Sequence, residues 1–366
     1  MADTAPLFSS FDHAKLSLKN RLVMAPMTRS FSPDGIPGDD VVAYYQRRAA
    51  GDVGLIITEG TTVDHPVASM DTRIPFFHGE ASLAGWQQVV EAVHQAGGKI
   101  APQLWHVGTA RRPGSGPNPD LTAHGPSGLI APGKQKAHIM TDSDIADTIA
   151  AFAKSAAHAK RIGFDAVELH GAHGYLIDQF FWQGTNIRSD RFGGDDVART
   201  TFASEIVKAV RAAVGESFPI ILRYSQWKQQ DYTAKLAPTP DALAAFLTPL
   251  VDAGVDIFHA STRRFWESEF EGSTLNLAGW TKKLTQLPSI TVGSVGLDTE
   301  FIASFAGAEA KPTHIDELLT RLVAAEFDLV AVGRALIADP LWGTKMKDAR
   351  FDDITGFSPK QLTQLI

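Results

Sequence analysis

Short apolar runs alternate with helix-like segments along almost the whole chain, and this alternation constrains the fold more than any other feature. The apolar runs lie at 22–25, 55–58, 99–104, 167–169, 220–223, 257–260, 290–293 and 329–332. Helix-like sequence lies between them at 39–50, 82–96, 142–162, 195–214, 240–253 and 313–325. Strands this apolar are typical of a parallel sheet buried on both faces. The pattern predicts an α/β fold, a single (β/α)8 TIM barrel.

Two longer segments interrupt the rhythm. Residues 107–140, after the third predicted strand, are rich in Gly and Pro, and we expect this insertion to form a lid or a wall of a site. A second long loop spans 263–276. The 366 residues suit one domain, 1–366. An open doubly wound sheet is the alternative fold, but no predicted strand is followed by a G-x-G-x-x-G fingerprint.

Charge and composition exclude several classes of protein. The net charge is -7, from 34 basic and 41 acidic residues, which gives no sign of a nucleic-acid or anionic-membrane partner. Cysteine is absent, so disulfides, iron–sulfur clusters and thiolate zinc sites are excluded. The N-terminus does not resemble a signal peptide, and no apolar run reaches transmembrane length. We therefore expect a soluble cytoplasmic protein.

Two histidines and a tyrosine follow the predicted strand 167–169. His170 and His173 are three residues apart, and Tyr175 comes two residues later. In an α/β barrel the chemistry takes place at this edge, where the strands end. Two imidazole N–H groups aimed at one carbonyl or nitro oxygen would bind it and stabilise the negative charge that forms there. The phenol of Tyr175, with an ordinary pKa of about 10, could donate a proton to a carbanion.

Two other interpretations of the histidines remain open. They could be metal ligands, but a zinc or iron site needs a third ligand, usually a carboxylate. Glu168 is the nearest carboxylate, and strand alternation places it on the same side as His170. They could also be buried structural histidines with satisfied hydrogen bonds. We expect no metal at this site.

Glycines and an arginine follow the last two predicted strands. Gly293-Ser294 ends the seventh strand and Gly333-Arg334 ends the eighth. In such barrels the loops after these two strands often form a phosphate site. Glycines let backbone N–H groups approach the anion, and Arg334 would add a fixed charge with several donors. The pattern indicates a phosphorylated ligand; the alternative is ordinary turn glycines beside a surface arginine.

Residues suited to binding a flat group follow the other strands. They are Pro26, Met27, Thr28, Gly60, Gln103, Trp105 and Arg223. A buried arginine or glutamine needs hydrogen-bond partners, which a planar heterocycle with alternating donors and acceptors would supply. Together with the phosphate site, these residues predict a flat cofactor with a phosphate tail across the barrel mouth.

These motifs, taken in order, resemble the old yellow enzyme family of FMN-dependent ene-reductases. The resemblance runs from about residue 16 to residue 342, and its landmarks lie at 18–29, 103–105, 170–175, 186–194, 293–294 and 332–334. It implies an FMN-binding TIM barrel that takes electrons from NADH or NADPH. The substrates implied are small alkenes activated by a carbonyl or nitro group, and the protein would be a monomer or a homodimer.

The resemblance also implies a role for each candidate residue. The isoalloxazine ring of FMN would contact Pro26, Met27, Thr28 and Gly60. Its pyrimidine edge would meet Gln103 and Arg223, and the Arg223 cation would stabilise negative charge there. The phosphate would be held by Gly293, Ser294, Gly333 and Arg334. The substrate would contact Thr28, Trp105, His170, His173 and Tyr175, with Tyr175 as the proton donor to Cα after hydride addition at Cβ.

Some positions depart from the best-known family members. Many carry asparagine where this chain has His173, and some carry cysteine where it has Thr28. The segment 357–366 has no arginine of the kind that some relatives insert into a neighbouring subunit. The roles of Arg263, Arg264 and Trp266, the natural alkene and the choice between NADH and NADPH are not assigned.

Two further function classes are compatible with a barrel of this kind. One is a flavin-free phosphosugar isomerase or aldolase, because a fold alone does not fix a function. The other is a ligand-binding barrel without turnover. An isomerase or aldolase would leave the features at 26–28 and 103–105 unexplained.

Overall fold

Eight parallel strands close into a barrel in a computed structural model that describes residues 3–13, 15–300, 303–304 and 306–366. The strands are β3 (Leu22–Met24), β4 (Leu55–Thr62), β5 (Lys99–Trp105), β10 (Val167–His173), β11 (Ile220–Lys228), β12 (Ile257–Ser261), β13 (Ser289–Val292) and β14 (Leu329–Val332). Each pairs in parallel with its neighbours, and β14 pairs with β3 to complete the ring. The predicted (β/α)8 TIM barrel is therefore confirmed.

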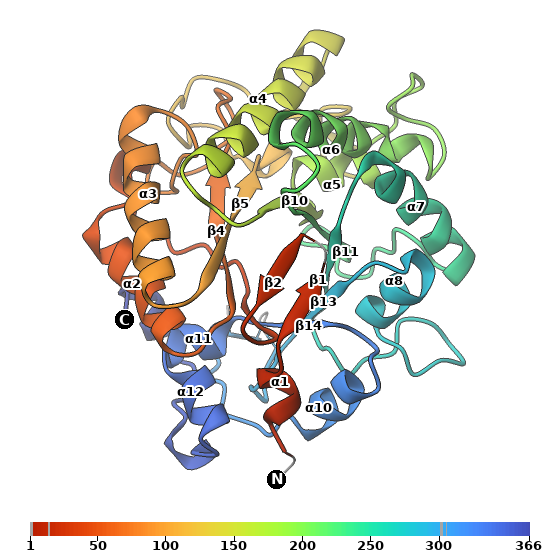
Figure 1. Cartoon of the computed structure of the whole chain (residues 1–366). Helices are drawn as coiled ribbons and strands as arrows, with labels where there is room; N and C mark the ends of the chain where they lie inside the picture. Colours follow the sequence, from red (N-terminus) through yellow and green to blue (C-terminus); the bar gives the residue numbers. More distant parts are fainter. Residues whose placement is uncertain (1–2, 14, 301–302, 305) are drawn as a thin grey trace.

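Helices surround the barrel, as Figure 1 shows. The longer ones are α2 (Asp39–Ala50), α3 (Glu80–Gln95), α4 (Asp142–Arg161), α6 (Thr201–Val214), α7 (Pro240–Ala253), α8 (Leu277–Thr285) and α10 (Asp316–Val323). Shorter ones are α1 (Ala5–Phe8), α5 (Leu176–Phe181), α11 (Arg334–Ala338) and α12 (Trp342–Lys347). Helix α8 was not predicted from the sequence. The Asn276 side chain caps it by accepting the Gly279 N–H at 2.9 Å.

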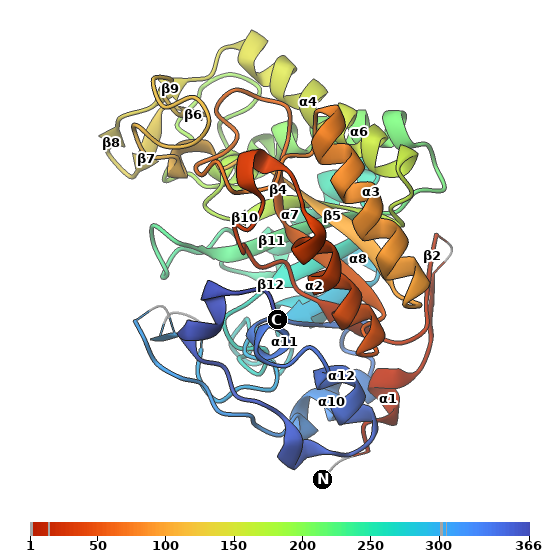
Figure 2. The same ribbon diagram turned by 90° about the vertical axis from the view of Figure 1, so that its left-hand side faces the viewer.

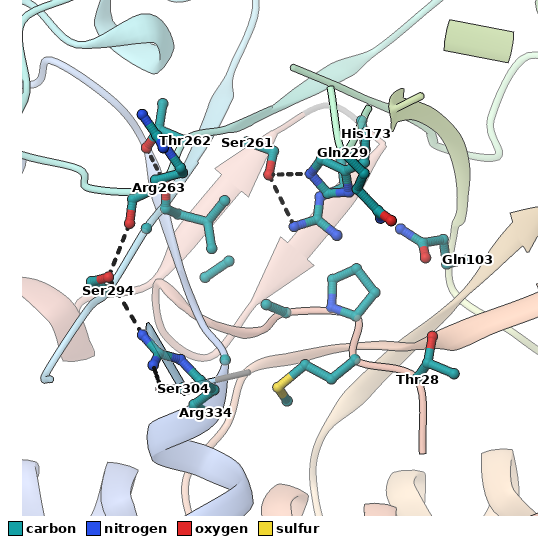
Figure 3. Close-up of a pocket in the computed structure, with 18 of the residues that line it drawn as sticks. Thr28, Gln103, His173, Gln229, Ser261, Thr262, Arg263, Ser294, Ser304 and Arg334 are labelled. Atoms are coloured by element: carbon teal, nitrogen blue, oxygen red, sulfur yellow. Dashed lines mark hydrogen bonds between the residues drawn. The ribbon is translucent and has the colours of Figure 1, made fainter. Parts of the chain in front are cut away.

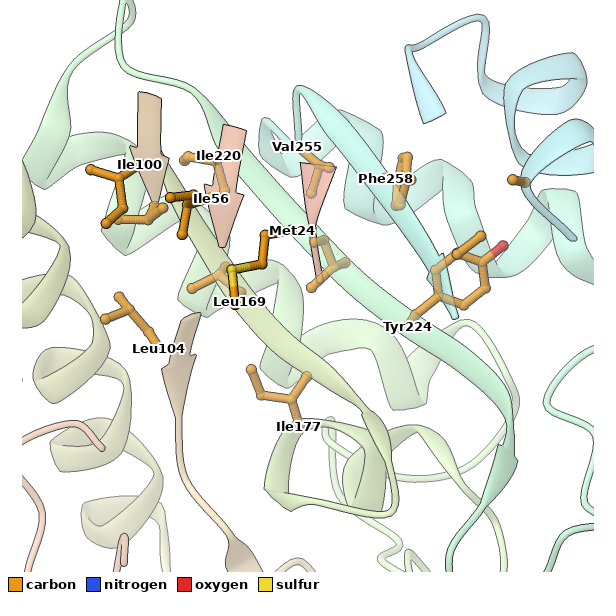
Figure 4. Packing of buried hydrophobic residues seen from close by; sticks show 14 of the residues in the cluster. Met24, Ile56, Ile100, Leu104, Leu169, Ile177, Ile220, Tyr224, Val255 and Phe258 are labelled. Carbon is orange, nitrogen blue, oxygen red and sulfur yellow. The ribbon is translucent and has the colours of Figure 1, made fainter. Parts of the chain in front are cut away.

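The strands are apolar on both faces because each face packs against a different layer. Leu22 and Met24 belong to the cluster between strands and helices, whereas Val23 and Ala25 belong to a cluster inside the barrel. Figure 4 shows part of the outer layer, including Ile56 beside Ile100. This alternation fixes which side chains can point into the barrel.

A small hairpin lies across the end of the barrel at which the strands begin (Figure 1). Strands β1 (Phe11–His13) and β2 (Leu16–Leu18) pair antiparallel. Phe11, Leu16 and Leu18 are buried in the same cluster as the inner residues of the barrel strands. The hairpin therefore plugs this end with apolar side chains.

The insertion 107–140 forms two small sheets, β6 (His124–Gly125) with β9 (His138–Ile139) and β7 (Leu129–Ala131) with β8 (Lys134–Gln135). They lie together at one side of the molecule, beside the start of α4 (Figure 2). The structure describes the whole insertion, and none of its residues lines the large cavity of the barrel. Its role as a lid stays a prediction.

None of the helices in the described part of the chain is long and apolar enough to cross a membrane.

Candidate active site

A cavity of about 730 Å³ opens at the end of the barrel where the strands terminate. This volume is typical of a site for a cofactor or a small ligand. Thirteen of the fourteen predicted site residues line it: Pro26, Met27, Thr28, Gln103, Trp105, His170, His173, Tyr175, Arg223, Gly293, Ser294, Gly333 and Arg334. The topology brings them together because the carboxyl ends of parallel strands meet at one edge.

Gly60, the remaining predicted residue, does not line the cavity. It lies on β4, and a Cβ built on it would come 2.4 Å from Cε3 of Trp105. The lack of a side chain at this position therefore makes room for the Trp105 indole, which does line the cavity. A contact between Gly60 and a flavin stays a prediction.

His170, His173 and Tyr175 converge at one side of the cavity. The two imidazole rings are 5.3 Å apart and perpendicular, and the Tyr175 ring lies 5.0 Å from that of His170. The backbone of His173 has φ +66°, and β10 shifts its pairing with β11 between Gly171 and His173. This irregular strand end brings both imidazoles to the same cavity.

Both histidines are neutral at physiological pH. Burial holds the pKa of His170 and that of His173 well below the ordinary value, and the Arg223 cation lowers them further. The Ala172 N–H donates to Nδ1 of His170 at 3.4 Å. This leaves the proton of a neutral His170 ring on Nε2, where it can be donated to a ligand.

Ser261 links His173 to Arg223, and Figure 3 shows Ser261 beside His173. Its hydroxyl lies 2.8 Å from Nε2 of His173 and accepts a hydrogen bond from Nη2 of Arg223 at 3.2 Å. Trp227 stacks on His173 with ring centroids 4.6 Å apart. The orientation of His173 is thus fixed from two sides.

The Tyr175 hydroxyl keeps its proton available. It accepts a hydrogen bond from Nε2 of Gln229 at 2.9 Å, so its own O–H is not donated to that amide. Burial raises the pKa of Tyr175 above its ordinary value, against the smaller opposing effect of Gln229. The phenol is therefore protonated at neutral pH and can act as an acid.

A buried polar network supports the floor of the cavity. Glu168 accepts a hydrogen bond from Nε2 of Gln103 at 2.7 Å, and its other oxygen lies 2.6 Å from Nδ1 of His259. Glu168 is therefore committed to these partners, and the metal site considered for His170, His173 and Glu168 gains no support. Nε of Arg223 is buried and has no hydrogen-bond partner among the described residues. A ligand edge with acceptors would satisfy it.

The opposite side of the cavity is suited to an anion. Gly293 has φ +146°, and a Cβ there would come 2.7 Å from Oγ1 of Thr262, so the close approach requires glycine. The hydroxyl of Ser294 donates to the carbonyl of Arg263 at 2.9 Å, and Nη2 of Arg334 reaches that hydroxyl at 3.5 Å. Burial lowers the pKa of Arg334 to about 10, which leaves it charged at neutral pH.

Several lining residues were not predicted from the sequence: Met70, Trp227, Gln229, Tyr232, Ser261, Phe357 and Leu362. Ser261 directly follows the predicted strand 257–260, so extending that strand by one residue would have found it. Phe357 and Leu362 come from the C-terminal segment, which Arg29 binds through the carbonyls of Gln361 and Gln364. Their contact depends on this long-range packing, for which there is no local signal.

The three residues without an assigned role occupy different places. Arg263 lines the cavity. Arg264 forms an ion pair with Glu267 at 2.8 Å outside it. Trp266 packs its ring against Phe265, with centroids 5.1 Å apart.

Comparisons with known proteins identify the family. The sequence model of the NADH:flavin oxidoreductase / NADH oxidase family matches residues 6–353. The NADPH dehydrogenase of Clostridium acetobutylicum is 31% identical over 359 residues, which cover 97% of each chain. The NADH oxidase of Thermoanaerobacter brockii is 34% identical over 95% of this chain and 52% of its own length. The chain thus spans only about half the length of two curated relatives that it matches along most of its own length.

The solved structures agree with the sequence relatives. A structure of morphinone reductase in complex with tetrahydroNAD is 28% identical, with a TM-score of 0.80 over 98% of this chain and 97% of that chain. An old yellow enzyme from Pichia shares the fold, with a TM-score of 0.80 at 24% identity over 98% of this chain and 90% of that chain. FMN as cofactor with NADH or NADPH as reductant is confirmed at the level of the family, and the flavin-free alternatives find no support. The chain belongs to the NADH:flavin oxidoreductase / NADH oxidase family, as one of the FMN-dependent oxidoreductases of the old yellow enzyme type.

Proposed function

We propose that this protein is an ene-reductase that uses NADH or NADPH and FMN to reduce the C=C bond of α,β-unsaturated carbonyl or nitro compounds. One observation carries the proposal: two neutral imidazoles and a protonated phenol converge in a cavity whose opposite side is suited to a phosphate. The donors match the oxygen of an activated alkene, and the anion site matches the phosphate of FMN.

The residues of the cavity fit FMN. Gly293, Ser294, Gly333 and Arg334 would hold its phosphate, and Pro26, Met27, Thr28 and Gly60 would contact its ring system. Gln103 and Arg223 would bind the pyrimidine edge, where Nε of Arg223, which has no partner among the described residues, needs an acceptor. When bound, FMN supplies the hydride acceptor and donor between nicotinamide and alkene.

His170 and His173 would bind and polarise the alkene. Hydrogen bonds from two neutral imidazoles to the carbonyl or nitro oxygen withdraw electron density from the conjugated C=C bond. They also stabilise the negative charge that reaches this oxygen when hydride adds at Cβ. Trp105, perpendicular to the Tyr175 ring at 4.8 Å, would form the side wall against which the substrate lies.

Tyr175 would complete the reaction by protonating Cα. Its hydroxyl accepts from Gln229, so its proton can be directed at the substrate. We further propose that the protein works as a monomer or a homodimer in the cytoplasm, with small molecules as its partners.

The proposal is tested by assaying a panel of alkenes with NADH and NADPH in the absence of oxygen. We expect reduction of cyclic enones and nitroalkenes, measured as nicotinamide consumption with formation of the saturated product. Oxidation of nicotinamide by oxygen alone, with no alkene product from any panel member, would contradict the ene-reductase proposal.

Replacing both His170 and His173 with alanine is expected to abolish the binding of phenols, whose oxygen resembles that of the substrate. FMN should remain bound, because neither imidazole is assigned to it. Phenol binding can be followed by the charge-transfer absorption that an electron-rich ring gives when it stacks on an electron-poor one. Unchanged phenol affinity in the double variant would rule out the oxygen-binding role.

Replacing Arg334 with alanine is expected to weaken FMN retention by about 1.5–3 kcal/mol, the range for a hydrogen bond to a charged group. The measurement is FMN content after dialysis, with Arg264→Ala as the matched control. Arg264 is a nearby arginine whose partner is Glu267 rather than the cavity. If the Arg334 variant keeps full occupancy through dialysis, the phosphate assignment is wrong.

A further inference from the structure

A second hollow, of about 640 Å³, lies outside the active site between the insertion 107–140 and the start of helix α4. It shares no lining residue with the large cavity. His65, His124, His138 and Asp144 all line it. The proposed reaction uses none of these three histidines or the carboxylate, so their grouping in one hollow indicates a separate role.

The side chains of His124, His138 and Asp144 are close enough to share one ligand. One ligand atom from each lies within 4.8 Å of the other two, and this is the one such group found among the described residues. Nε2 of His138 is 2.8 Å from Oδ2 of Asp144, and the rings of His124 and His138 are 4.6 Å apart. Nδ1 of His124 is buried and has no hydrogen-bond partner in the described part of the chain.

We propose that His124, His138 and Asp144 bind a divalent first-row transition metal of the Zn²⁺ class. Two imidazole nitrogens and a carboxylate oxygen form a ligand set that suits zinc, and water would complete the tetrahedron. Metal–ligand bonds of about 2.0–2.2 Å require the three side chains to close by roughly an ångström. His138 can make this movement because its side chain is 43% exposed and lies on the short strand β9.

Charges of both signs surround the three proposed ligands. Asp64 and Asp147 line the same hollow, and Lys136 and Arg111 are opposing cations. Asp64 is already paired with Lys154 at 2.8 Å, so Asp147 is the nearby carboxylate on α4 that adds to the attraction. The His65 ring lies 5.3 Å from that of His124 and completes the wall of the hollow.

A metal here would fasten the insertion to the barrel. His124 and His138 belong to β6 and β9 of the insertion, whereas Asp144 belongs to the first turn of α4, where it also caps the helix with Thr141. Bound metal would therefore add a cross-link between two elements that the chain itself and the hydrogen bond between His138 and Asp144 already join. The expected effect is rigidity of the insertion rather than a change in the chemistry of the cavity.

The test is titration of chelator-treated, FMN-loaded protein with Zn²⁺, followed by calorimetry. We expect one equivalent to bind the wild type. We expect His124→Ala and His138→Ala each to weaken binding by more than the roughly 10–100-fold that loss of an outer-shell partner of a metal costs. His94→Ala is the matched control, because His94 also forms a 2.8 Å contact with a carboxylate, Asp165, outside the proposed group. This control should bind Zn²⁺ like the wild type.

Limited proteolysis gives a second readout, which does not depend on enzyme activity. Zn²⁺ should slow cleavage within 107–140 in the wild type and in His94→Ala, but not in His138→Ala. His138 is exposed, so its variant should fold and keep FMN, which visible absorption checks. The proposal is overturned if the wild type shows no saturable binding, or if the stoichiometric site survives in both His124→Ala and His138→Ala.

Discussion

Replacing Tyr175 with phenylalanine is expected to slow enone reduction by about 10²–10⁴-fold, the usual contribution of a positioned general acid. Reduction of the enzyme by NADH or NADPH should proceed near the wild-type rate, because that half-reaction needs no proton donor. The substitution keeps the aromatic ring, which packs at 4.8 Å from Trp105, and removes only the hydroxyl. Stopped-flow measurement of each half-reaction separates the two effects.

Nitroalkenes should be affected less than enones in the same variant. Hydride addition to a nitroalkene gives a nitronate, a stable anion that can leave before it is protonated. Tyr224→Phe is the control for loss of a buried tyrosine hydroxyl outside the cavity, since Tyr224 pairs with Thr281 instead. Unimpaired enone reduction in Tyr175→Phe would show that the proton comes from elsewhere, and an equal loss in both half-reactions would indicate a structural defect.

Replacing Lys228 with methionine is expected to lower the free energy of unfolding by about 3–5 kcal/mol, because it leaves a buried carboxylate without its counter-charge. Lys228 and Asp178 have fully buried side chains, 2.7 Å apart between Nζ and Oδ1. The other oxygen of Asp178 accepts a hydrogen bond from the backbone N–H of Gly174 at 2.7 Å. Gly174 lies between His173 and Tyr175 in the sequence. The loss of stability can be measured by urea denaturation at several pH values.

The sign of the pH dependence follows from Asp178. Burial raises its pKa to about 6 even with Lys228 beside it, well above the ordinary value for the unfolded chain. Removing the ammonium group raises this folded-state pKa further. A group whose pKa is higher in the folded than in the unfolded protein stabilises the fold at pH values below the unfolded-state pKa. This stabilisation is lost as the pH rises through the folded-state pKa. Lys228→Met should therefore be less stable relative to the wild type at pH 8 than at pH 5.

Two matched variants serve as controls for the loss of stability in Lys228→Met. Lys99→Met breaks the partly exposed pair with Asp165, also 2.7 Å long, and should cost less than about 1 kcal/mol. Lys228→Met combined with Asp178→Asn should be less unstable than the single variant, since no unpaired charge then remains. A loss for Lys228→Met no larger than that for Lys99→Met would show that the buried pair contributes little.

The barrel could be predicted from the sequence because its strands are apolar on both faces, but the strand ends could not. Strand β11 extends to Lys228 and β4 to Thr62, beyond the predicted limits at 223 and 58. Most of the extra residues are polar, and they are buried because they face the cavity or have specific partners. Helix α8 was missed because a side-chain cap at Asn276 starts it inside a long irregular segment.

The candidate site was predictable to the extent that its residues stand at the ends of strands. That rule places His170, Arg223 and Gly293 without any knowledge of side-chain contacts. It could not find Gln229, which reaches Tyr175 from beyond β11, nor Phe357, which arrives through packing of the C-terminal segment. It also could not show that Gly60 serves the Trp105 ring instead of lining the cavity.

The hairpin of β1 and β2 has a consequence for the traffic of molecules. Because its apolar side chains close the end of the barrel at which the strands begin, ligands would reach the cavity from the opposite end. With FMN bound, a cavity of about 730 Å³ would leave room for only one further ligand at a time. Nicotinamide and alkene would therefore compete for the same binding site. An excess of either would inhibit binding of the other.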